Sequence, residues 1–101
     1  MDLKNLYKQA QQMQNKMQKV QSDLEKEIIQ GEAGGGAVIV YANCKGEIQK
    51  VKINKESIDL EDDIDILEDL ILAAYNDVKK KADHKASKSM SSAGLPSNLM
   101  T

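Results

Sequence analysis

The sequence predicts an α+β fold in which the chain runs helix, strand, strand, strand, helix. Three observations lead to this fold: heptad-spaced apolar residues near the N-terminus, three short strand-like segments, and a second amphipathic helix. We expect a three-stranded antiparallel sheet with two flanking helices. With 101 residues, the chain should form one domain. We place this domain at residues 1–88 and predict a flexible C-terminal tail, rich in serine and small residues, at 89–101.

The first helix is predicted at residues 3–24. Its apolar residues recur at intervals that alternate between three and four, from Leu3 to Leu24, and this is the a/d pattern of a helix that meets one partner helix. Such a narrow stripe favours association of two chains, with packing back onto the same chain as the alternative. Aromatic residues make up only 3 % of the chain. A lone chain of this size would therefore have a thin core, which also favours a homodimer.

Three strands are predicted, at residues 27–33, 37–42 and 47–53. The middle segment is apolar at every position, so both of its faces should be covered. Asn43 to Gly46 has the composition of a hairpin turn, with a glycine where a positive φ is expected.

Gly34, Gly35 and Gly36 lie between the first two strands. A phosphate-binding loop runs from a strand through glycines into a helix, whose N-terminal amides hold the anion. Here the glycines lead from strand to strand, and no Gly-Lys-Ser/Thr follows them. They are therefore predicted to make a turn through unusual φ values and to bind no nucleotide.

The second helix is predicted at residues 62–86. Eight acidic residues and no lysine lie in 56–69, whereas lysines dominate 79–88. This order complements the helix dipole, so helix stabilisation is an alternative to binding for the acidic residues. The acidic run is not an EF-hand, because Ile64 and Leu70 occupy the positions that require Gly and Glu.

Catalytic and metal-binding patterns are missing from the sequence. The single histidine, His84, lies among lysines, and the single cysteine, Cys44, lies in a turn. We therefore predict no enzyme activity, no cofactor, no metal site and no small-molecule substrate. One cysteine suits a reducing compartment, and no apolar run is long enough to span a bilayer. The prediction is a cytoplasmic protein without a membrane partner.

The order of these segments resembles one known family. The stretches GEAGGGAVIVYANCKGEIQKVKIN (31–54) and LEDLILAAYNDVKKKA (67–82), after a Gln-, Lys- and Met-rich helix, are similar to the YbaB/EbfC family of bacterial nucleoid-associated DNA-binding proteins. The resemblance covers essentially residues 4–82. It implies an intertwined homodimer with helices projecting from a central sheet. It also implies a nucleoid location, binding of double-stranded DNA with low sequence specificity, and an influence on nucleoid organisation and gene expression. Cys44 departs from the family, which commonly has glycine there.

The candidate site residues follow from the resemblance and from the charge pattern. The first DNA-binding candidates are the lysines near the end of the second helix: Lys79, Lys80, Lys81, Lys85 and Lys88. The second set lies on the outer face of the first helix: Lys4, Lys8, Lys16 and Lys19. The predicted dimer interface contains Leu6, Met13, Met17, Val20, Val38 and Val40.

Two interpretations of these surfaces stay open. All fourteen basic residues are lysine, and the commonest base-specific contact favours the planar guanidinium of arginine, so the chain is better equipped for phosphate contacts than for base reading. Any single lysine could equally be part of a solvated face. The alternative function is a protein-interaction or scaffold dimer that acts through its acidic segment (56–69) or its Gln-rich first helix.

Overall fold

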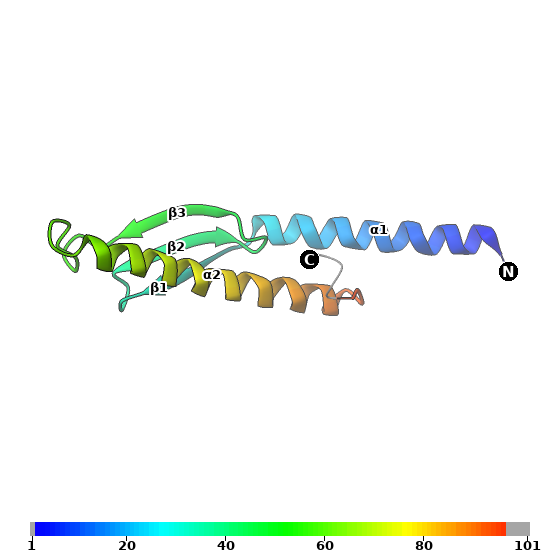
Figure 1. Cartoon of the computed structure of the whole chain (residues 1–101). Coiled ribbons are helices and arrows are strands. Elements are labelled where there is room, and N and C mark those ends of the chain that lie inside the picture. Colours follow the sequence, from blue (N-terminus) through cyan, green and yellow to red (C-terminus); the bar gives the residue numbers. More distant parts are fainter. Residues whose placement is uncertain (1, 97–101) are drawn as a thin grey trace.

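The computed structural model describes residues 2–96 and confirms the predicted α+β architecture. In chain order the elements are α1 (Leu3–Lys26), β1 (Ile28–Ala33), β2 (Val38–Asn43), β3 (Ile48–Ile53) and α2 (Ile64–Ser92). The strands form one antiparallel sheet in the order β1-β2-β3. The molecule extends over 70 × 19 × 16 Å, because α1 projects away from the sheet (Figure 1).

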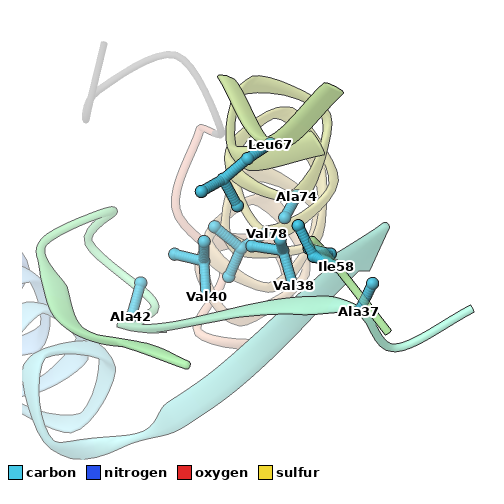
Figure 2. Close-up of a cluster of buried hydrophobic side chains, with 8 residues drawn as sticks. All are labelled: Ala37, Val38, Val40, Ala42, Ile58, Leu67, Ala74 and Val78. Carbon is cyan, nitrogen blue, oxygen red and sulfur yellow. The ribbon is translucent and has the colours of Figure 1, made fainter. Parts of the chain in front are cut away.

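Helix α2 packs across β1 and β2 and forms the main core with them. Alternate residues of β2, among them Val38 and Val40, point toward α2, which contributes Leu67, Ala74 and Val78 (Figure 2). The other β2 residues point to the opposite face of the sheet, where Ile39 and Tyr41 are only partly buried. A single chain therefore covers only one face of β2, whereas the apolar sequence of this strand predicted that both faces would be covered.

This core corrects two predicted interface positions. Val38 is 0 % exposed and Val40 is 1 % exposed beneath α2 of the same chain. Their side chains have no surface left for a partner, because the helix of their own chain already occupies that face. Val20 is likewise buried by its own chain, whereas Leu6 and Met13 remain exposed.

Helix α1 packs back onto its own chain over part of its heptad stripe and leaves the rest of the stripe exposed. Met17, Val20 and Leu24 pack against the end of α2, where Met90 and Leu95 complete a second core cluster. The stripe nearer the N-terminus is uncovered by the described residues, and its exposed large side chains are Leu3, Leu6 and Met13. The helix begins after Asp2, whose carboxylate accepts a hydrogen bond from the Lys4 backbone N–H at 3.0 Å.

The glycine-containing connections have the predicted backbone geometry. Gly34, Gly35 and Gly36 have φ values of 66°, 66° and 92°, so the run turns the chain from β1 into β2. Gly46 has a φ of 86° in the β2–β3 turn. That turn is held by Asn43, whose side-chain oxygen accepts hydrogen bonds from the backbone N–H groups of Lys45 and Glu47 at 3.0 Å each.

The C-terminal segment differs from the predicted tail. Helix α2 continues to Ser92, and Met90 and Leu95 are buried at 1 % and 5 % exposure. Residues 89–96 therefore belong to the packed structure, because their apolar side chains cover the last turns of α1. The remainder of the predicted tail, 97–101, lies outside the described residues.

Candidate nucleic-acid interface

The predicted lysines of α2 lie on one helix, but they are not equivalent. Lys81 forms an ion pair with Asp77 at 3.1 Å, and Lys85 forms one with Glu27 at 2.7 Å. Lys79 makes a looser contact with Asp83 at 3.8 Å, in which both side chains are more than half exposed. Within residues 2–96, Lys80 and Lys88 have no acidic group within ion-pair distance.

Lys81 and Asp77 form hydrogen bonds with the backbone of β1, which is an edge strand of the sheet. One carboxylate oxygen of Asp77 accepts the backbone N–H of Glu32 at 3.0 Å, while Lys81 Nζ donates to the carbonyl oxygen of Gln30 at 3.1 Å. The N–H of Glu32, followed by Lys81, lowers the pKa of Asp77. These contacts bond α2 side chains to backbone groups that an edge strand would otherwise expose. Lys81 therefore has a structural role here.

Lys85 belongs to a junction between α1, α2 and the β2–β3 turn. The hydrogen bond from Lys85 to Glu27 lowers the pKa of Glu27, and the same contact raises the pKa of Lys85. The backbone N–H of Cys44 donates to the carbonyl oxygens of Leu24 and Glu27, at the C-terminal end of α1. Burial raises the pKa of the Cys44 thiol, so the thiolate form is disfavoured.

Two hollows adjoin the α2 lysines. One is a mainly apolar hollow of about 360 Å³ lined by Ile29, Lys80, Lys81, His84 and Lys85. The other, of about 350 Å³, lies between the helices and is lined by Val20, Asp23, Lys85, Lys88, Ser89 and Ser92. Both are open to solvent and are lined in part by lysine side chains, and a lysine ammonium group can bind phosphate.

The α1 candidates share a face of that helix. At about 100° per residue, Lys4, Lys8, Lys16 and Lys19 lie roughly opposite the heptad stripe. All four side chains are exposed. Lys19 pairs with Asp23 at 3.6 Å, but both side chains are largely in solvent, so this contact is weak and leaves the lysine available.

A third group of lysines lies on and beside β3 and is not among the site residues predicted from the sequence. We call Lys45, Lys50, Lys52 and Lys55 the β3 lysine row. All four are exposed, and none forms an ion pair within the described part of the chain. The sequence already shows this group as four lysines in eleven residues. Only the strand register of the structure tells which face of the sheet they occupy.

Residues 2–96 contain neither a metal-binding group of side chains nor a membrane-spanning helix. No group of three or more His, Cys, Asp or Glu side chains is placed to hold a metal ion there. Neither helix, over the same residues, contains a stretch that is long and apolar enough to cross a membrane.

Comparison with known proteins shows the family to which the chain belongs. A nucleoid-associated protein of Clostridium novyi is 49 % identical over 90 residues, which cover 89 % of this chain and 78 % of that protein. A nucleoid-associated protein of Ruminiclostridium cellulolyticum is 44 % identical over 100 residues, covering 94 % and 86 %. The crystal structure of an uncharacterised Helicobacter pylori protein shares the fold, with a TM-score of 0.73, 24 % identity, and coverage of 83 % and 87 %. The sequence model of the YbaB/EbfC DNA-binding family matches residues 1–95. The chain belongs to the YbaB/EbfC DNA-binding family.

Proposed function

We propose that this protein binds duplex DNA as a homodimer, with low sequence specificity, on the nucleoid in the cytoplasm. It acts there as a binding protein, without catalysis, cofactor or small-molecule substrate, and influences nucleoid organisation and gene expression. The observation that supports this best is a set of lysines on the two helices, notably Lys80 and Lys88, that have no strong ion-pair partner among residues 2–96. The family is also named for DNA binding.

The homodimer is supported by apolar surface that one chain leaves uncovered. Met13 is 47 % exposed on the stripe of α1, and Val51 is 44 % exposed on β3. Val51 pairs with Val40, so it lies on the α2-facing side of the sheet, but α2 packs over β1 and β2. A second copy of the chain can bury both regions, and a core this small gains from such association.

We expect a Met13→Lys variant to lose the dimer, because the substitution would leave an unpaired charge in a buried interface. Sedimentation equilibrium at micromolar concentration should give twice the chain mass for the parent and the chain mass for the variant. The matched control is Gln12→Lys, which adds the same charge on the outer face of the same helix and should stay dimeric. A folded monomeric parent, or two variants that behave alike, would exclude this interface.

Low sequence specificity follows from the chemistry of the side chains. A lysine ammonium is a compact point charge that neutralises phosphate, and phosphate contacts carry no sequence information directly. The chain has fourteen lysines and no arginine. We therefore expect an affinity of about 10⁻⁴ to 10⁻⁶ M at physiological salt, as is usual for non-specific binding, and similar competition by unrelated duplexes.

The test is a titration of a fluorescent duplex at several salt concentrations. If three to five phosphates are neutralised per dimer, log affinity should fall against log salt with a slope of about −3 to −4.5. A triple variant of Lys79, Lys80 and Lys88 to Gln should weaken binding to all sequences equally and flatten the slope by at least about 1. Lys81 and Lys85 are left intact, because they also hold the fold together.

The matched control changes the same three residues to Arg, which keeps the charge and should keep the slope. Binding that does not depend on salt, or a Gln variant that binds like the parent, would remove this part of α2 from the site. If the parent does not bind any duplex at low salt, the protein-interaction function through residues 56–69 or through α1 takes its place.

A further inference from the structure

We propose that the β3 lysine row is a second, separate phosphate-binding surface, through which the protein contacts another duplex and bridges two DNA segments. This inference rests on the proposed function, because it assumes that the helices hold the first duplex. It concerns a face of the molecule that lies away from the α2 lysines. It also adds the bridging of two duplexes, which DNA binding alone does not imply.

The strand register places two of these lysines on the face of the sheet opposite α2. Lys52 pairs with Ile39 and Lys50 pairs with Tyr41, and neither of these β2 residues shares the α2-facing side with Val38. Lys50 Nζ lies 5.9 Å from the centre of the Tyr41 ring, which confirms that both side chains are on the same face. Successive lysines of this face are about 6.6 Å apart along the strand.

The row continues beyond both ends of β3. Lys45 is in the preceding turn, and Lys55 follows the strand beside a hollow of about 540 Å³ lined by Gly36, Ile39, Lys52, Ile53, Asn54, Lys55 and Glu56. Three glutamates border the row: Glu32, Glu47 and Glu56. None forms an ion pair with a lysine of the row within the described residues, and Glu47 accepts a hydrogen bond from Asn43 at 2.9 Å instead.

This face is a poor candidate for the homodimer interface. Its β3 side chains, Lys50 and Lys52, are charged and exposed, and burying them between two copies would desolvate ammonium groups that have no partner. The uncovered apolar side chains are elsewhere, on α1 and on the α2-facing side of β3, where Val51 lies. The lysine row therefore stays in solvent when those surfaces associate.

The β3 lysine row and the lysines of α2 face different directions. In Figure 1, β3 lies at the edge of the sheet away from α2, and Lys80 is on the side of α2 that points away from the core formed by Ala74 and Val78. A straight duplex against one surface cannot also lie against the other, and wrapping it around the sheet would require sharp bending, which costs energy. Two separate duplexes satisfy both surfaces without that cost.

The experiment separates binding of one duplex from bridging of two. One duplex is fixed to beads, the full-length protein is added, and capture of a second, labelled duplex is measured; affinity for a single duplex is measured in parallel. A triple variant in which Lys50, Lys52 and Lys55 are changed to Gln should capture at least about five-fold less of the labelled second duplex than the parent. Its affinity for a single duplex should stay within about two-fold of that of the parent. The triple Gln variant of Lys79, Lys80 and Lys88 should lose both.

The charge-preserving control changes Lys50, Lys52 and Lys55 to Arg and should bridge like the parent.

Lysines on an edge strand also prevent edge-to-edge aggregation, so each variant is checked for a single species without DNA. If only the Gln variant aggregates, the row has that protective role and the proposal is overturned. Undiminished bridging by the Gln variant, or a parent that binds one duplex and never captures a second, would overturn it as well. If the Gln variant of the β3 lysine row loses as much single-duplex affinity as the α2 variant, the two groups of lysines form one binding surface, and the proposal of a second surface is wrong. If the parent binds no duplex, the proposed function itself fails, and that result is visible in the parallel titration.

Discussion

A Gly31→Ala variant should be strongly destabilised or unable to fold. Gly31 is buried where β1 passes directly beneath α2. A Cβ atom at this position would lie 2.5 Å from the carbonyl oxygen of Ala74 and closer still to the backbone nitrogen of Val78. These are backbone atoms of a hydrogen-bonded helix and cannot rotate away as a side chain would. Overpacking usually costs about 1–3 kcal/mol and occasionally more, and we expect at least about 3 kcal/mol here.

Urea denaturation at a fixed protein concentration measures this effect, because the apparent stability of the proposed dimer would depend on concentration. The matched control is Gly35→Ala. Gly35 has a φ of 66°, and no atom lies within 4 Å of a Cβ placed there. That variant should lose only the cost of a left-handed backbone, about 1–2 kcal/mol. If Gly31→Ala is no less stable than Gly35→Ala, the close approach of β1 and α2 does not exist in solution.

A Met90→Ala variant should lose about 2–5 kcal/mol of unfolding free energy, the usual cost of truncating a large buried side chain. Met90 is 1 % exposed and packs in the cluster that contains Leu24 and Leu95. The substitution leaves a cavity between the ends of the two helices, which the rigid helices can only partly close. The midpoint of urea denaturation should fall accordingly.

The control for this variant is Ser91→Ala, one residue further along α2 and exposed, which should change stability by no more than about 0.5 kcal/mol. Equal effects of the two substitutions would mean that residues 89–96 are not packed against α1 and that the sequence-based prediction of a flexible tail describes this segment better.

Local sequence patterns were sufficient to determine the elements and their order. Heptad spacing defined α1, glycines at positive φ marked the two strand connections, and a helical stripe marked α2. These signals are carried by neighbouring residues, so they can be read without knowing the fold. The end of α2 was misjudged for a related reason: the serine-rich composition of 89–96 outweighed two apolar residues, Met90 and Leu95, whose partners on α1 lie some seventy positions earlier in the chain.

Only the tertiary structure decided which partner each side chain has. The sequence grouped Lys79, Lys80, Lys81, Lys85 and Lys88 as one cluster. The fold divides them, because Lys81 bonds to the edge of β1 and Lys85 pairs with Glu27 at the end of α1. Similarly, Val38 and Val40 are apolar strand residues that suit a core or an interface equally well, and the position of α2 places them in the core. Charge and hydrophobicity are properties of single residues, whereas pairing and burial depend on segments far apart in the chain, and folding alone brings these together.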